Sequence, residues 1–225
     1  MKKKITDEFI CLILARKGSK RIKDKNLVKL KGKPLIEFTI KAAAKVIPPR
    51  NIFISTNDNR IKQITKKYKI NYIKRPEKIS KDDSSSEDAI LHAINFFKER
   101  HNAKHIIFLQ PTSPLRTSID ILNCVQKYKK KKLDSIFSVF LAKRFIWIKT
   151  KKLLSLTFNY KKRKRSQNLQ KLIIENGAIF IFNIKKFMKF KNRIFGKFDY
   201  FEMTENKSFD IDNLEDLEIV KKIIS

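Results

Sequence analysis

Short runs of apolar, mostly β-branched or aromatic residues alternate along the first 140 positions with longer stretches whose apolar residues recur every three or four positions. Runs of the first kind predict buried β-strands, and stretches of the second kind predict amphipathic helices. We expect strands at residues 9–14, 51–56, 70–74, 105–110 and 134–140. We expect helices at residues 34–46, 58–68, 85–100 and 117–130.

This alternation of strands and helices is typical of an α/β protein, in which parallel strands are covered by helices on both faces. It predicts a three-layer, Rossmann-like fold with a mainly parallel sheet. Ser84 and Glu87 have the spacing of a capping box at the start of the third helix. Thr117 is expected to cap the fourth.

The alternation stops after Phe140. Two short strands are expected at residues 145–149 and 153–158, a basic stretch follows at 161–170, and regular structure resumes at 176–183. We therefore expect one domain over residues 1–225, with an inserted subdomain at about 140–172 that has no core of its own. The chain closes with a strand-like segment at 208–212 and a helix at 213–224.

The composition adds a strong positive charge. The formal net charge is +31, from 53 basic and 22 acidic residues. Such a field attracts nucleotides, nucleic acids and anionic membranes. The basic residues occur in nearly every segment, however, which is also typical of a general compositional bias.

Two further features concern the location of the protein. No window approaches the roughly 20 apolar residues of a membrane-spanning helix, and the two cysteines cannot build a disulfide framework. Cys11 lies in an apolar strand and Cys124 in a helical pattern, so we expect both to be packing residues. These features favour a reduced, cytoplasmic protein.

The connection at residues 15–34 is long for a segment between a strand and a helix. In an open parallel sheet, ligands bind beyond the carboxyl ends of the strands, which is where this loop begins. It offers Gly18 for a close approach of the backbone, and side-chain donors suited to a triphosphate, namely Arg16, Ser19, Lys20, Lys25 and Asn26. The loop matches neither a Walker A nor a dinucleotide-binding glycine pattern, so its residues alone leave open an anion site or a basic surface loop.

A second polar segment follows the fourth strand. Pro111 and Pro114 stiffen it, and it presents the side chains of Gln110, Thr112, Ser113 and Arg116. Its residues, 110–116, which we call the shelf, are compatible with a rigid ligand-binding surface or with an ordinary turn before a helix.

Asp210 and Asp212 are two positions apart in the strand-like segment, so both carboxylates should lie on one face. Like charges at this distance repel each other, and Mg²⁺ bridging to phosphate oxygens relieves the repulsion. A solvated pair near a helix start is the alternative.

Six segments in this order carry a resemblance to a known family. They are residues 15–40, 54–58, 75–94, 108–117, 175–182 and 209–217. Together they resemble the CMP-sialic acid synthetases, cytidylyltransferases that activate nine-carbon 2-keto sugar acids of the sialic, legionaminic or pseudaminic type. The resemblance covers nearly the whole chain and implies that CTP and the acid give a CMP-sugar and pyrophosphate.

The resemblance also implies roles for individual residues. The triphosphate would be held by Arg16, Ser19, Lys20 and Lys25, and the cytosine and ribose by Asn26, Arg75 and Ser86. The sugar acid would be contacted by Gln110, Thr112, Ser113, Asn176 and Gly177. Asp210 and Asp212 would bind Mg²⁺, and with Arg16 and Lys20 they form the expected catalytic set. A homodimer through the inserted section is implied as well.

The sequence departs from the family pattern at Lys23, at Asn57 and within residues 165–170. Two alternatives remain at this point. One is the related 3-deoxy-manno-octulosonate cytidylyltransferase. The other is a basic nucleic-acid-binding protein, although no nucleic-acid-binding motif is present and we expect no specific nucleic-acid partner.

Overall fold

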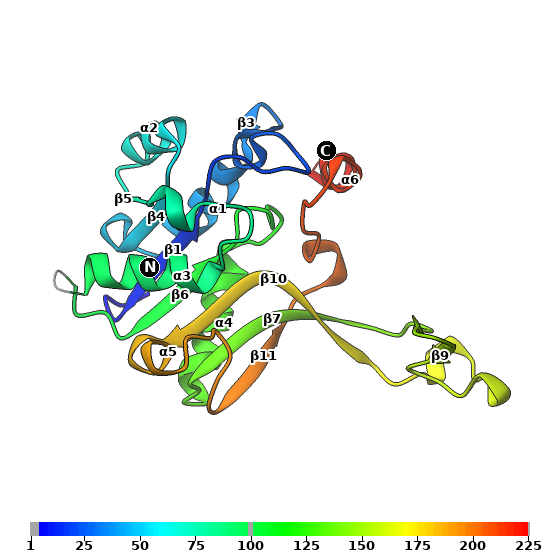
Figure 1. Ribbon diagram of the computed structural model, residues 1–225. Helices are drawn as coiled ribbons and strands as arrows, with labels where there is room; N and C mark the ends of the chain where they lie inside the picture. The colour runs from blue at the N-terminus through cyan, green and yellow to red at the C-terminus, as the bar shows by residue number, and fades with distance from the viewer. Residues whose placement is uncertain (1–4, 99–100, 225) are drawn as a thin grey trace.

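A seven-stranded sheet in the order β11-β7-β10-β6-β1-β4-β5 forms the centre of the computed structural model, which describes residues 5–98 and 101–224 (Figure 1). Its strands are β1 (Phe9–Leu14), β4 (Ile52–Thr56), β5 (Asn71–Lys74), β6 (His105–Leu109), β7 (Ser135–Ala142), β10 (Leu172–Asn183) and β11 (Phe198–Glu202). Strand β10 is antiparallel to its neighbours β6 and β7, whereas the other neighbouring strands pair in parallel.

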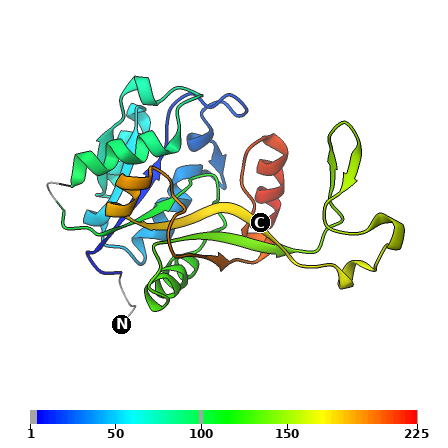
Figure 2. The same ribbon diagram turned by 60° about the horizontal axis from the view of Figure 1, so that its bottom comes forward.

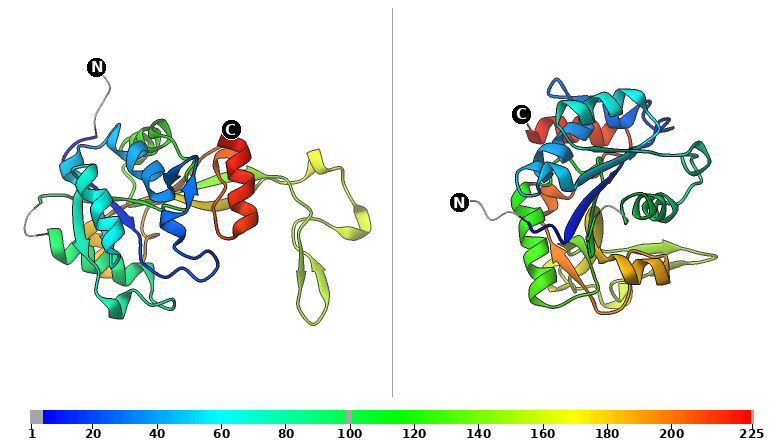
Figure 3. Two further views of the ribbon diagram at one scale, coloured as in Figure 1. Left: turned by 90° about the horizontal axis from the view of Figure 1, so that it is seen from above. Right: turned by 90° about the vertical axis from the view of Figure 1, so that its left-hand side faces the viewer.

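Helices cover both faces of this sheet, as the right-hand view of Figure 3 shows. They are α1 (Leu35–Ala44), α2 (Asn59–Lys67), α3 (Ser86–Phe97), α4 (Ser118–Lys130), α5 (Ile184–Phe190) and α6 (Leu214–Ile224). One apolar core lies between the sheet and the helices α1 and α4, and a second lies under α3 and α5. A third, smaller core joins α6 to the loop that follows β1. The predicted three-layer α/β fold is confirmed.

The two cysteines pack as the sequence predicted. Cys11 and Cys124 are free and fully buried. Burial raises the pKa of the Cys11 thiol to about 12, so this thiol stays protonated and unreactive at neutral pH. Within the described ranges, no helix is both long and apolar enough to span a bilayer.

Three local expectations were wrong or incomplete. The N-cap of α3 is Ser85, whose side chain accepts from the Asp88 amide, and not Ser84. Helix α3 ends at Phe97, while Glu99 and Arg100, which the prediction included, lie outside the described residues. Residues 208–212 are extended but pair with no strand. By contrast, Thr117 caps α4 in a full capping box with Asp120.

Residues 143–171 leave the sheet between β7 and β10 and form an arm that projects away from the rest of the molecule (Figure 2). The arm contains the two-stranded hairpin of β8 (Trp147–Lys149) and β9 (Leu153–Ser155). Several of its large apolar side chains are exposed, among them Leu153, Leu154 and Leu156.

The polar segments singled out in the sequence meet at one edge of the sheet. Strands β1, β4, β5 and β6 run in the same direction, so the segments that follow them start at this edge. Strand β10 runs the opposite way, and Ile179 in it pairs with Leu109 at the end of β6. The residues just before Ile179, Asn176 and Gly177, therefore lie at the same edge, where the pairing of β10 with β7 is interrupted by a register shift.

Candidate active site

The loop after β1 is tied to the segments after β4 and β5. The side-chain amide of Asn26 donates to the Arg16 carbonyl oxygen at 3.1 Å. The Lys17 amide donates to Asn57 Oδ1 at 2.8 Å, and the Asn57 amide nitrogen donates to both carboxylate oxygens of Glu77 at 3.1 and 3.0 Å. Asn57 thus links two neighbouring segments at the edge of the sheet and fixes the first turn of the loop.

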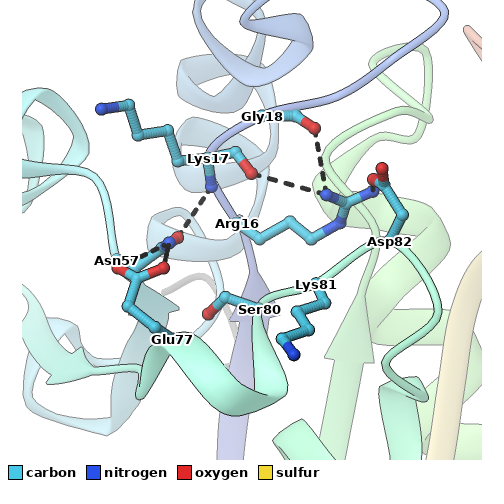
Figure 4. Close-up of a pocket in the computed structure, with 8 residues that line it drawn as sticks. All are labelled: Arg16, Lys17, Gly18, Asn57, Glu77, Ser80, Lys81 and Asp82. Atoms are coloured by element: carbon cyan, nitrogen blue, oxygen red, sulfur yellow. Dashed lines mark hydrogen bonds and ion pairs between the residues drawn. The ribbon is translucent and has the colours of Figure 1, made fainter.

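Four cations of this loop are held by two carboxylates. Asp82 lies 2.5 Å from an Nη atom of Arg16 (Figure 4). It also lies 2.9 Å from Lys20 Nζ. Asp212 lies 2.9 Å from both Lys25 Nζ and an Nη atom of Arg21. Hydrogen bonds from Lys20 and Arg16 hold the pKa of Asp82 below its usual value.

Two adjoining cavities open around these side chains. One of about 330 Å³ is lined by Arg16, Lys17, Gly18, Asn57, Glu77, Ser80, Lys81 and Asp82. The other, of about 280 Å³, is lined by Arg16, Ser19, Lys20, Arg21, Lys25 and Asp82. Arg16 and Asp82 line both cavities, so the structure gathers all four residues predicted for the triphosphate, with a carboxylate among them.

Arg75 is buried beneath the segment that joins β5 to α3. Its Nε donates to the Ile79 carbonyl oxygen at 2.8 Å. Burial lowers the pKa of Arg75 to about 10, and the charge of Arg16 contributes to the shift. Arg75 therefore remains protonated at neutral pH and close enough to Arg16 to be affected by it. Ser86, also predicted for the nucleoside, is the first residue of α3.

Arg116 lies inside the protein and does not present a donor to the surface. Only 2% of it is exposed. Its Nη1 donates to the carbonyl oxygens of Gln110 at 3.1 Å and Ala178 at 2.7 Å, while Nη2 donates to Thr39 Oγ1 at 2.6 Å. This side chain ties the residue after β6 and the middle of β10 to α1, so it supports the polar segment that follows β6.

The predicted sugar-contacting residues fall into two groups. The Gln110 side chain lies against Gly177, where an added Cβ atom would be 2.9 Å from Gln110 Oε1. Asn176, in contrast, is buried and faces inward: its Oδ1 accepts from Ser138 Oγ at 2.6 Å, and its Nδ2 donates to Ser208 Oγ at 2.8 Å. Asn176 therefore connects β7 and β10 to the segment that carries the aspartates.

Asp210 and Asp212 lie on one side of an extended segment, because Phe209 and Ile211, which alternate with them, pack into the small core beside α6. The Ile211 amide donates to the Thr112 carbonyl oxygen at 2.9 Å, which joins the segment to the shelf after β6. Asp216 accepts from the amides of Asp212 and Asn213 at 2.8 and 3.0 Å and thereby begins α6.

The two aspartates differ in their surroundings. Burial, together with the charge of Asp212, raises the pKa of Asp210, and this outweighs its contact with Thr112. Burial also acts on Asp212, but the Lys25 hydrogen bond and the Lys25 and Arg21 charges lower its pKa overall. Oδ1 of Asp210 is buried and has no hydrogen-bond partner among the residues described.

The Asp210 and Asp212 carboxylates fit a magnesium site in which substrate phosphate oxygens and waters supply the remaining ligands. The described part of the chain contains no group of three or more His, Cys, Asp or Glu side chains placed to hold a metal. Mg²⁺ commonly binds through one or two carboxylates, with waters and phosphate oxygens as its other ligands. The unpartnered Asp210 oxygen and the Asp212 carboxylate supply such a donor pair.

Sequence reasoning missed three residues at this edge. Asp82, Arg21 and Glu77 contact the predicted loop or its supports, yet each lies in a stretch of mixed charge where nothing distinguishes it. Of the histidines, His105 contacts the Tyr128 hydroxyl at 2.9 Å, and burial lowers the pKa values of both His92 and His105. His92 lies close enough to Arg75 for that charge to lower its pKa further.

Several proteins of known kind are similar to this chain over nearly its whole length. The chain is 30% identical over 213 residues to an N-acylneuraminate cytidylyltransferase of Streptococcus agalactiae, covering 92% of this chain and 51% of that protein. It is 29% identical over 229 residues to the post-translational flagellin modification protein B of Campylobacter coli, covering 96% and 95%. The chain thus spans about half the length of the N-acylneuraminate cytidylyltransferases of Streptococcus agalactiae and Escherichia coli.

Solved structures share the fold. A CMP:2-keto-3-deoxy-manno-octonic acid synthetase complexed with CTP superposes with a TM-score of 0.70 at 16% identity, covering 96% of this chain and 98% of that one. A 4-diphosphocytidyl-2C-methyl-D-erythritol synthase from Anaerococcus prevotii gives a TM-score of 0.63 at 13% identity, covering 96% and 97%.

A family model described as cytidylyltransferase matches residues 10–224, a range that includes the loop after β1, the shelf after β6 and the two aspartates. The chain belongs to the cytidylyltransferase family.

Proposed function

We propose that the protein transfers a cytidylyl group from CTP to a nine-carbon 2-keto sugar acid of the sialic, legionaminic or pseudaminic type, giving the CMP-sugar and pyrophosphate. The observation that carries the proposal is the convergence of Arg16, Lys20 and Lys25 with Asp210 and Asp212 at one edge of the sheet. The similarity to N-acylneuraminate cytidylyltransferases supports this class of acceptor.

In this proposal the triphosphate binds in the loop after β1. Arg16, Lys20 and Lys25 exchange their carboxylate partners for phosphate oxygens, and Ser19 adds a hydroxyl donor. Asn26, Arg75 and Ser86 surround the cytosine and ribose. Because Asn26 and Arg75 are buried and hydrogen-bonded to backbone carbonyl groups, they present a preformed surface to the nucleoside.

The acceptor lies beside the shelf after β6, against Gln110, Thr112, Ser113, Gly177 and the bulge that Asn176 supports. Its anomeric hydroxyl oxygen forms a bond to the α-phosphorus, the bond from that phosphorus to the pyrophosphate oxygen breaks, and the hydroxyl proton is released. Asp210 and Asp212 would hold Mg²⁺, which when bound withdraws charge from the phosphates. Alignment and charge neutralisation supply most of the rate in this chemistry.

The proposal also includes the assembly of the protein and its location. We propose a homodimer formed through the arm of residues 143–171, because its exposed leucines lack a core of their own. A two-stranded hairpin such as β8–β9 is marginal in isolation and gains stability from a partner surface. A reducing, cytoplasmic location is consistent with the two unpaired, buried cysteines.

The function is tested with a panel of sugar acids and nucleotides. We expect pyrophosphate release with CTP, Mg²⁺ and a nine-carbon acid, and much slower release with ATP, GTP or UTP. Equal use of UTP would contradict the assigned nucleoside contacts. Release with 3-deoxy-manno-octulosonate but with no nine-carbon acid would favour the related octulosonate enzyme, whose fold this chain shares.

The Asp82→Asn variant tests the triphosphate loop. Asp82 competes with phosphate for Arg16 and Lys20, so removing its charge should strengthen CTP binding. Exposed ion pairs are weak, which limits the expected decrease in the Kd of CTP to roughly 2- to 5-fold. Calorimetric titration with CTP measures the effect, and Asp83→Asn, at the neighbouring exposed carboxylate, is the matched control. A weaker binding of CTP to Asp82→Asn than to Asp83→Asn would show that Asp82 assists the nucleotide.

The Asp210→Asn and Asp212→Asn variants test the metal site. Each keeps the side-chain shape but removes an anionic ligand, so turnover should fall on the order of 10²–10³-fold and require more Mg²⁺. Thermal melting without metal should change little, because repulsion between the two carboxylates is relieved. The assignment is refuted if both variants melt normally and retain wild-type turnover at low Mg²⁺.

A paired substitution in the arm tests the dimer. Leu154 and Leu156 are 50% and 65% exposed, so charging both should disrupt an interface without disturbing the core. We expect the Leu154→Asp, Leu156→Asp variant to sediment as a monomer and the wild type as a dimer. Leu214→Asp on α6, also exposed at 63%, serves as the control and should remain dimeric. Identical sedimentation of the arm variant and wild type would exclude this interface.

A further inference from the structure

Arg193, between α5 and β11, is held in place against the ends of three elements. Its guanidinium carbon lies 4.7 Å from the centre of the Phe180 ring and 5.5 Å from that of Phe108, and these two rings stack on each other. Its Nε donates to Glu87 Oε1 at 2.8 Å, in the first turn of α3. A cation over an aromatic face is attracted by the ring, so the guanidinium has a defined position.

The backbone around Arg193 is fixed as well. The Phe195 amide donates to Ser135 Oγ at 3.0 Å, and that hydroxyl donates to the Phe195 carbonyl oxygen at 2.9 Å. Gly196 follows with φ +61°, and a Cβ atom there would lie 2.3 Å from Asp134 Oδ2. The segment is therefore anchored to the start of β7, and Arg193 is not a loose surface side chain.

Arg193 lies at the same edge of the sheet as the proposed sugar-binding residues. It contacts Phe108, the next-to-last residue of β6, and Gln110 directly follows that strand. Phe180 pairs with Phe108, and the Gln110 side chain lies against Gly177 of the same strand β10. Glu87, the partner of Arg193, directly follows Ser86. The guanidinium thus lies over the end of β6 that Gln110 follows.

Part of the guanidinium has no protein partner. Across residues 5–98 and 101–224, neither Nη atom of Arg193 makes a hydrogen bond, and the side chain is 23% exposed. Arginine binds carboxylates most strongly with a pair of parallel donors. Here Glu87 accepts a hydrogen bond only from Nε, and the ring of Phe180 covers one face of the guanidinium plane. The two terminal amino groups are consequently positioned and remain available to an oxygen acceptor.

We propose that Arg193 binds an oxygen acceptor on the sugar acid and thereby contributes to the affinity for that acid. This inference rests on the proposed function. The acceptor is either the carboxylate, which every 2-keto acid carries, or the carbonyl oxygen of an acylamino substituent, which only some acids carry. Both offer the planar oxygen acceptor that a guanidinium recognises.

The test replaces Arg193 with Met, which keeps an apolar stem over Phe180 but removes the donors. We expect the KM of the sugar acid to rise at least about tenfold, as for loss of a charged hydrogen bond, with kcat and the KM of CTP within about twofold of wild type. Arg193→Lys keeps the charge without the planar fork and should recover part of the affinity. Arg50→Met is the matched control, because Arg50 pairs with Asp7 near the start of β4, at the opposite edge of the sheet.

Pairs of acids that differ only in an acylamino or a hydroxyl substituent separate the two acceptors. A rise in KM confined to the acylated acid identifies the acyl carbonyl, and an equal rise for both acids identifies the carboxylate. Unchanged KM values for every acid in a normally melting Arg193→Met variant overturn the inference alone. If the wild type releases no pyrophosphate with any of the acids tested, the proposed function is overturned, and the inference with it.

Discussion

The buried guanidinium of Arg116 is the interaction on which the edge of the sheet depends. An ionised group in the interior is tolerated only when its hydrogen-bonding capacity is met, and Arg116 meets most of this requirement with two backbone carbonyl groups and Thr39. Those acceptors come from β6, β10 and α1, so one side chain fixes the place where the antiparallel strand β10 joins the parallel half of the sheet. Asp120 and Asp210 are the carboxylates whose charges act on the pKa of Arg116, which connects this buried cation to the aspartate pair.

Aspartate side chains fix the positions of several cations at this edge of the sheet. The formal net charge is +31, yet four cations of the loop after β1 are paired, Arg16 and Lys20 with Asp82 and Arg21 and Lys25 with Asp212. Pairing orders long side chains before a ligand arrives, which reduces the entropy lost on binding. The same carboxylates would compete with a bound phosphate group for these cations. The pairing that orders the loop would therefore also weaken its binding of phosphate. The Asp212 carboxylate has a second consequence, because it holds Lys25 beside the proposed metal position.

The strands and helices of the layers could be predicted because their apolar periodicity reflects burial directly. Features that depend on a partner elsewhere in the chain could not. Residues 208–212 alternate as a strand does, yet no neighbouring edge pairs with them, and the alternation instead packs Phe209 and Ile211 beside α6. Ser84 and Ser85 each precede an acidic residue at capping distance, and only the fold selects Ser85. The loop residues were identifiable from their type and from the family resemblance. Asp82 was not, because its importance arises from contacts with residues more than 60 positions away.

The charges at the edge of the sheet also bear on how two anionic substrates could meet there. In the proposed arrangement, the triphosphate side has paired cations on a long loop, and the acceptor side has uncharged donors on a segment that Arg116 and Asn176 support. Arg193 adds one cation on the acceptor side, with its position set by Phe180 and Glu87. Cations on both sides would reduce the repulsion between an acid and a nucleotide that must come within bonding distance. Arg193 belongs to the segment after α5 and the loop cations belong to the segment after β1, so the proposed contact to the acid and the proposed contacts to CTP lie on separate segments of the chain.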